Sequence, residues 1–153
     1  MTTSERGAML NLADARVIVD AALSYAREHQ FPAMTVAVLD AAGSLVAFAR
    51  EDSSSLLRER IARGKAAGAL NMGVGSRALA ARAQSHPQFV TSLIALAGGD
   101  LVPVPGGVLV RTGDGVLVGA VGVSGHQPDQ DEACAVAGIR ATAFTPDPGA
   151  SEA

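Results

Sequence analysis

Three histidines, a lysine flanked by glycines and an acidic pair are the residues of this 153-residue chain whose types suit ligand binding or proton transfer. The histidines His29, His86 and His126 lie far apart and show no metal-ligand spacing such as His-x-x-x-His. The sequence therefore predicts no metal site.

His126 is the histidine best placed for acid–base work or ligand contact. It follows Ser124-Gly125 and precedes a predicted helix N-terminus, which can hold an anion. The alternative is a solvated residue at the start of the last helix. His86, at another helix start, is either a solvated cap residue or a ligand contact. His29 lies in the last turn of the first predicted helix, where its imidazole complements the helix dipole.

Lys65 stands out among the basic residues because it lies in an alanine-rich predicted helix between Gly64 and Gly68. Each glycine costs a helix about 1 kcal/mol relative to alanine, so we expect close packing or a closely approaching ligand to compensate. A cation in this position suits the carboxylates of haem propionates or of a small organic acid. Arg50 opens the same basic stretch and is a second candidate for such a contact, although a solvated face would also explain the arginines there.

The acidic pair Asp131 and Glu132 opens the last predicted helix, where carboxylates are favourable without any chemical role. Asp131 is nevertheless a candidate general base. Ser124 is a candidate ligand contact, and its Val-Ser-Gly context lacks the Gly-x-Ser-x-Gly elbow of a nucleophilic serine. Cys134, inside an alanine-rich helix, is expected in the core.

Two predicted hairpins position these residues. Strands at 108–111 and 116–123 flank the turn Thr-Gly-Asp-Gly, and strands at 34–39 and 45–49 flank Asp-Ala-Ala-Gly. Glycine at a strand end often marks close approach of a ligand or another backbone. Gly106, Gly107 and Gly125, at the ends of the hairpin formed by 108–111 and 116–123, are therefore expected to line the site.

Helical periodicity predicts helices over 12–30, 56–71, 76–82, a short segment after Ser85 and a segment after Asp129. Asn11 is the expected cap of the first helix. Ser85 with Gln88, and Asp129 with Glu132, fit capping boxes. In the helix after Ser85, the buried side is expected to comprise Phe89, Leu93, Ile94 and Ala97.

Composition excludes several classes of function. A net charge of −3 and a pI near 5.5 argue against a nucleic-acid partner. No apolar run approaches the length of about 18 residues that spans a bilayer, and the N-terminus lacks a secretory apolar region. One cysteine cannot form an intramolecular disulfide. We therefore expect a cytoplasmic protein with no membrane partner.

Two hairpins separated by helices predict an α+β fold in which helices cover an antiparallel sheet. A single domain is expected over residues 10–143, with flexible tails at 1–9 and 144–153.

The segment Pro103–Gly125 resembles the GlcG/HbpS family of haem-binding or haem-degrading-type domains, which includes the C-terminal domain of PduO-type proteins. The likeness rests on its Pro-x-Pro-Gly-Gly entry, on Val118–Gly125 and on Asp131-Glu132. It extends to the segments 12–15, 34–50 and 63–65. The resemblance implies a profilin-like layered sandwich with helices on both faces of the sheet. It also gives Lys65 and Asp131 counterparts in the family pattern.

The resemblance leaves three functions open. The first is binding, storage or breakdown of haem or a related tetrapyrrole, with haem as the cofactor and a histidine such as His29 as an axial ligand. The second is a small hydrolase, isomerase or lyase acting on an organic acid, because relatives are associated with glycolate and aromatic degradation. Such an enzyme would use Lys65 or an arginine as a carboxylate clamp and His126 or Asp131 for proton transfer. The third is an assembly domain without a ligand.

Self-association is expected in each case. Relatives assemble as dimers or larger multiples, and small side chains recur at helical spacing along the last helix, at Ala133, Ala137 and Ala141.

Overall fold

The computed structural model of the chain describes residues 9–149 and consists of five helices and five strands in that range. Their order along the chain is as follows: α2 (Leu12–Glu28), β1 (Thr35–Asp40), β2 (Leu45–Arg50), α3 (Arg58–Met72), α4 (Ser76–Ser85), α5 (Pro87–Leu96), β3 (Gly107–Arg111), β4 (Leu117–Ser124), α6 (Pro128–Arg140) and β5 (Thr145–Asp147). None of these helices is long and apolar enough to cross a membrane.

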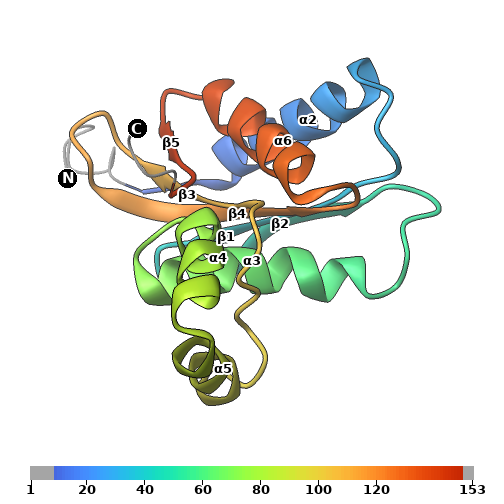
Figure 1. Cartoon of the computed structure of the whole chain (residues 1–153). Coiled ribbons are helices and arrows are strands. Elements are labelled where there is room, and N and C mark those ends of the chain that lie inside the picture. The colour runs from blue at the N-terminus through green and yellow to red at the C-terminus, as the bar shows by residue number, and fades with distance from the viewer. Residues whose placement is uncertain (1–8, 150–153) are drawn as a thin grey trace.

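The strands form one antiparallel sheet in the order β2-β1-β4-β3-β5. Helices α2 and α6 pack against each other above the sheet in Figure 1, and α3 lies below it with α4 and α5. The expected α+β sandwich with helices on both faces is confirmed. The order places β4 in the centre, so that residues at its C-terminal end lie between the two helical layers.

Each face of the sheet has its own apolar core, because side chains alternate along the strands. Val36, Val121 and Val123 point toward α2 and α6, where the larger core also contains Ile18 and Ile139. The smaller core, on the α3 face, comprises Leu39, Ala66, Ala69, Leu109 and Ala120. Small side chains in this second core let α3 approach the sheet closely.

Glycines make that approach possible. A Cβ at Gly122 of β4 would overlap the Ala62 carbonyl oxygen of α3. A Cβ at Gly64 would lie 2.6 Å from the Val102 side chain, and one at Gly68 would lie 3.0 Å from the Leu101 side chain. The compensation expected for the two helix glycines is therefore close packing within the chain.

The first helix begins as predicted, and the later caps differ. The Asn11 side chain accepts a hydrogen bond from the Asp14 amide at 2.8 Å. Both α5 and α6 instead start with proline as the first helical residue, preceded by His86 and Gln127 as caps. The capping boxes predicted at Ser85 and Asp129 are therefore wrong, because a proline at the first helical position fixes the start of each helix.

Residues 145–147 form strand β5, although the sequence places them in a flexible tail. Leu109, Val110 and Arg111 of β3 pair with this strand, and Arg111 Nε lies 2.9 Å from Asp147 Oδ2. Pro146 is tolerated because an edge strand leaves one row of amides outside the ladder. The prediction of a tail from residue 144 is therefore wrong for these residues, and residues 1–8 and 150–153 lie outside those described.

Helix α5 is far more exposed than predicted. Val90 is its only buried residue, whereas Phe89 is 45% exposed and Leu96 is 86% exposed. The helix packs on α4 and projects away from the sheet (Figure 1). The predicted inward orientation of Phe89 is thus wrong, because the helix has no second layer to pack against within the described chain.

Candidate functional site

Lys65 and Asp131 form a buried ion pair that joins the two helical layers. Lys65 belongs to α3 and Asp131 to α6, and Lys65 Nζ lies 2.9 Å from Asp131 Oδ2. The lysine also donates to the Val123 carbonyl oxygen at 3.0 Å. The two side chains are only 3% and 1% exposed. The lysine charge is therefore already matched inside the protein.

Burial shifts both groups toward their neutral forms. Loss of solvation lowers the pKa of Lys65 and raises the pKa of Asp131, and it outweighs the opposing attraction between the two charges. The charge of nearby Arg58 lowers the pKa of both groups. It therefore adds to the effect of burial on Lys65 and opposes that effect on Asp131. A pair of this kind is tolerated because each charge has a partner, and removing either partner would leave a buried charge uncompensated.

Two glycines at the start of β3 make room for Lys65: Gly106 for its side chain and Gly107 for its backbone. A Cβ at Gly106, whose φ is +126°, would lie 2.8 Å from Lys65 Nζ. A Cβ at Gly107 would overlap the Lys65 carbonyl oxygen, and the Gly107 amide donates to the buried Ser76 hydroxyl at 2.7 Å. These glycines do converge with Lys65, and the close approach they permit is that of the protein's own lysine.

The residues at the end of β4 lie beside this pair. The Ser124 hydroxyl accepts a hydrogen bond from Arg58 at 3.1 Å and is fully buried. A Cβ at Gly125 would lie 2.5 Å from the Ala33 carbonyl oxygen. The His126 amide donates to Asp131 Oδ1 at 2.8 Å. The sequence predicted that an anion could bind at the start of this last helix, and the Asp131 carboxylate of the protein itself takes that place.

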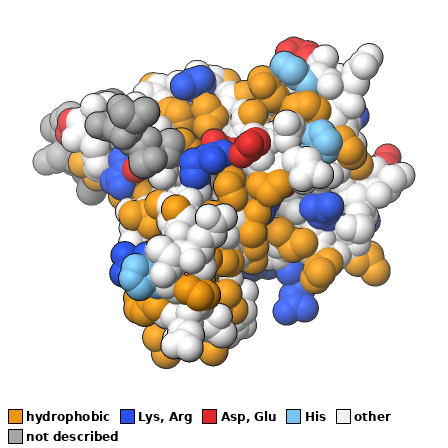
Figure 2. All heavy atoms as spheres, in the orientation of Figure 1, with side chains coloured by type: hydrophobic (Ala, Val, Ile, Leu, Met, Phe, Trp, Pro, Cys, Tyr) orange, Lys and Arg blue, Asp and Glu red, His pale blue; other side chains and the backbone are white. Residues whose placement is uncertain are grey.

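His126 and His29 both lie against Phe31, in a cluster that we call the histidine–aromatic corner: Tyr25, His29, Phe31 and His126. The Phe31 ring centroid lies 5.0 Å from that of His126 and 5.6 Å from that of His29. The His29 ring stacks on Tyr25 with centroids 4.0 Å apart. Figure 2 shows two of the three histidines near one another at the upper right, over the end of α2 and the start of α6.

The orientation of His29 is fixed by a hydrogen bond from Nδ1 to the Tyr25 carbonyl oxygen at 2.8 Å. Because a carbonyl oxygen only accepts, Nδ1 carries the proton and Nε2 of the neutral ring keeps its lone pair. Histidines that ligate metals are commonly held in this way by a bond from the other ring nitrogen. His29 also ends α2 as its C-cap, as its predicted role at the helix end requires.

Arg50 lines a cleft of about 400 Å³ together with Arg27, Ala33, Glu51 and Asp52. The cleft adjoins the histidine–aromatic corner through Arg27, which donates to the Phe31 carbonyl oxygen at 2.7 Å and pairs with Glu51 at 3.0 Å. Arg50 donates to the Ser54 carbonyl oxygen at 3.0 Å and remains exposed. Its guanidinium is therefore a cation accessible to a ligand, unlike Lys65.

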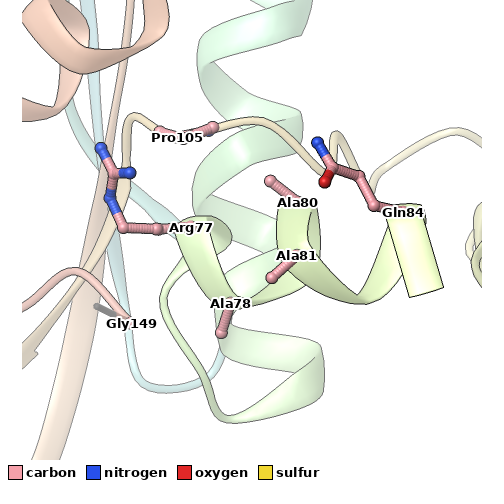
Figure 3. Close-up of a pocket in the computed structure, with 7 residues that line it drawn as sticks. All are labelled: Arg77, Ala78, Ala80, Ala81, Gln84, Pro105 and Gly149. Atoms are coloured by element: carbon pink, nitrogen blue, oxygen red, sulfur yellow. The ribbon is translucent and has the colours of Figure 1, made fainter. Parts of the chain in front are cut away.

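A larger hollow of about 860 Å³ lies along α4. Figure 3 shows Arg77 and Gln84 toward its two ends, and the lining is completed by Ala78, Ala80, Ala81, Pro105 and Gly149. The Arg77 guanidinium is already bonded to Glu132 at 2.8 Å and to Asp129. No histidine lines this hollow.

The remaining candidates lie elsewhere. His86 caps α5 and contacts the Ser85 hydroxyl at 2.9 Å. Cys134 is fully buried, and burial raises the pKa of its thiol to about 12, as expected for a core residue. Within residues 9–149, no group of three or more His, Cys, Asp and Glu could hold a metal ion.

The structure thus brings together most of the residues singled out by sequence, namely Lys65, Gly106, Gly107, Ser124, Gly125, His126 and Asp131. It leaves Arg50 and His86 outside this group. Sequence reasoning missed Phe31 and Tyr25 as neighbours of the two histidines. Their spacing from His29 was a usable signal, since Tyr25 lies one helical turn before it.

Comparison with known proteins identifies the family of this fold. A family model described as haem-degrading protein HbpS-like matches residues 10–140. No curated protein matches. Among solved structures, PduOC in complex with haem is similar at 26% identity and a TM-score of 0.80, over 89% of this chain and 96% of that one.

Two further structures are similar. HbpS shares 28% identity with a TM-score of 0.75, over 86% of this chain and 89% of that one. The Klebsiella pneumoniae protein ORFY shares 26% identity with a TM-score of 0.80, over 92% of this chain and 95% of that one. Because the family model spans most of the described fold, the chain belongs to the HbpS-like family of haem-degrading proteins.

Proposed function

We propose that this protein binds haem or a related tetrapyrrole at the histidine–aromatic corner. The observation that carries the proposal is the state of His29, whose Nδ1 is held by the Tyr25 carbonyl so that Nε2 is free to ligate iron. The family and the haem complex of the similar PduOC support the choice of ligand.

The residues around His29 fit a tetrapyrrole. Two of the five Phe and Tyr residues of the chain and two of its three histidines gather in this corner. The Phe31 ring offers an apolar surface to a macrocycle, and His126 borders the same ring. The neighbouring cleft supplies Arg50, whose guanidinium suits a propionate carboxylate. Bound haem would supply an iron centre for storage, or for oxygen chemistry if the protein promotes breakdown.

The organic-acid enzyme is less well supported by the geometry. Of its two predicted carboxylate clamps, Lys65 or an arginine, the lysine is buried and bonded to Asp131 and to the Val123 carbonyl oxygen. A substrate carboxylate would have to displace Asp131 from a site with 3% exposure. The same ion pair occupies Asp131, which leaves His126 for proton transfer and the exposed Arg50 as the clamp of such an enzyme.

A haemin titration followed by visible absorption tests the proposal. The wild type is expected to give a Soret band distinct from that of free haemin. His29→Ala should shift or abolish this band, and His126→Ala should weaken binding through loss of contact beside Phe31. His86→Ala, at the start of α5 and outside the histidine–aromatic corner, is the matched control and should bind as the wild type does. Arg50→Ala should weaken binding by roughly 3- to 10-fold, as for loss of one exposed charge-assisted contact.

The proposal fails if haemin gives no specific band, or if His29→Ala and His126→Ala both bind as the wild type does. If haemin does bind, storage and breakdown can be told apart by adding a reductant in air to the haem-loaded protein. A persistent Soret band would indicate storage, and bleaching that depends on His29 would indicate breakdown.

Self-association and a cytoplasmic location complete the proposed function. A single buried cysteine gives the described domain no disulfide framework, which suits a reducing compartment. Light scattering should give a mass above the 15.4 kDa of one chain, and a mass of one chain alone would contradict self-association.

A further inference from the structure

Helix α5 carries a second apolar stripe that nothing within the described chain covers. Val90, Ile94 and Ala97 face the rest of the domain, with Val90 buried and the other two half-buried. Phe89 and Leu96 lie on a neighbouring side, about 100° around the helix, and are 45% and 86% exposed. With the half-buried Leu93, they recur at the four- and three-residue spacing of one helix face.

A ten-residue helix with this exposure is poorly stabilised by itself. Isolated helices shorter than about 12 residues are marginal in water, and packing of an apolar face supplies most helix stability in proteins. Figure 1 shows α5 standing away from the sheet, in contact with α4. A surface that covers the outward stripe would therefore stabilise α5.

The charges at the two ends of α5 indicate what that partner is. No charged residue occurs from Pro87 to Gly99. Arg82 lies at the N-terminal end, with its guanidinium carbon 5.3 Å from the centroid of the Phe89 ring. Exposed Asp100 follows the C-terminal end. The surface is thus positive at one end, uncharged along its length and negative at the other end.

Such a surface is complementary to itself when reversed. If two copies of α5 pack antiparallel about a two-fold axis near Leu93, each Phe89 faces the partner's Leu96 and each Arg82 approaches the partner's Asp100. A two-fold interface requires this self-complementarity. An anionic membrane surface fits less well, because interfacial helices carry a basic polar face, which α5 lacks.

We infer that α5 is the self-association surface of this protein, through antiparallel pairing of the Phe89–Leu93–Leu96 stripe with the same stripe of a second copy. The inference rests on the proposed self-association, which it makes specific, and it is independent of haem binding.

Sedimentation velocity of the full chain over a concentration series tests the inference. The wild type is expected to form a dimer, and Leu96→Glu should raise the dissociation constant by about 100-fold or more, as for a central apolar contact. Leu56→Glu is the matched control: Leu56 is also 86% exposed, lies outside α5 and should leave the dimer unchanged. Circular dichroism should show the wild-type fold in both variants.

A charge exchange tests the antiparallel arrangement. Arg82→Glu and Asp100→Lys should each weaken the dimer by roughly 3- to 10-fold, and the double variant should restore it, because the two ends are again complementary.

The outcomes separate this inference from the broader proposal. An oligomer that survives Leu96→Glu would overturn the α5 interface while leaving self-association intact. A monomeric wild type at about 100 µM, well above typical weak dissociation constants, would overturn both, whether or not the protein binds lipid vesicles or another protein. Equal loss of the dimer in Leu96→Glu and Leu56→Glu would also overturn the α5 interface.

Discussion

Replacing Asp131 by asparagine should reveal how strongly the buried ion pair is coupled to folding. Asparagine keeps the shape of the side chain and an acceptor for the His126 amide, and it removes the charge opposite Lys65. Breaking a buried pair by removing one partner typically costs about 3–5 kcal/mol. We expect a loss of this size in the free energy of unfolding near neutral pH.

The size of this loss should depend on pH, because Lys65 can release its proton. Burial already lowers the pKa of Lys65, and loss of the Asp131 attraction lowers it further. In the unfolded chain the lysine has its ordinary pKa of 10.5. Between these two values the unfolded state binds more protons, so the free energy of unfolding of the variant rises with pH, by up to about 1.4 kcal/mol per pH unit. The gap between variant and wild type should therefore narrow in alkaline buffer.

Urea unfolding monitored by circular dichroism, from about pH 6 to about pH 9.5, measures this slope. Lys65→Met should also be destabilising, because it leaves the Asp131 carboxylate buried. The double variant should lose at least about 2 kcal/mol less than the two single losses added together. Asp129→Asn is the control: it removes a carboxylate from the same helix, but the side chain is 73% exposed, so the expected loss is under about 1 kcal/mol. A loss below 1 kcal/mol for Asp131→Asn, constant over the pH range, would refute the reasoning.

Two further predictions concern close packing. Gly122→Ala should cost more than about 2 kcal/mol in thermal or urea unfolding, because its Cβ would overlap the Ala62 carbonyl oxygen. Gly113→Ala, where a Cβ would have open space, should be nearly neutral, and equal losses in the two variants would contradict this account. The Cys134 thiol, with its pKa raised to about 12, should react with a thiol reagent only as fast as the domain unfolds. Rapid labelling under native conditions would show that the helix opens locally.

The sequence predicted which residues converge better than it predicted what they do there. The order of strands and helices follows from hairpin turns and apolar periodicity, which are local signals. That Lys65 bonds to Asp131, 66 positions away along the chain, depends on how α3 and α6 lie across the sheet. A lysine among glycines is equally typical of a ligand clamp and of a buried partner, so the sequence alone could not separate the two.

Competing local signals account for the errors at helix starts and at the C-terminal strand. Ser85 and Asp129 both match a capping pattern, but a proline a short distance away fixed the start of each helix. Thr145–Asp147 contains a proline in a turn-like context, and its strand exists because β3 offers an open edge. The exposure of Phe89 could not be predicted from the sequence either. The periodicity of α5 shows which residues share an apolar face, but it does not show what covers that face.

The ion pair between Lys65 and Asp131 has a consequence for which parts of the domain unfold together. Helices α3 and α6 lie on opposite sides of the sheet, and a side chain from one is bonded to a side chain from the other at the sheet end. Because separation of either layer from the sheet breaks this ion pair, we expect the two layers and the sheet to unfold together as one cooperative unit. Helix α5 has no such attachment and packs on α4, so in the free chain we expect it to unfold before the rest of the domain. Opening of α5 alone would therefore leave the sheet and the Lys65–Asp131 pair intact.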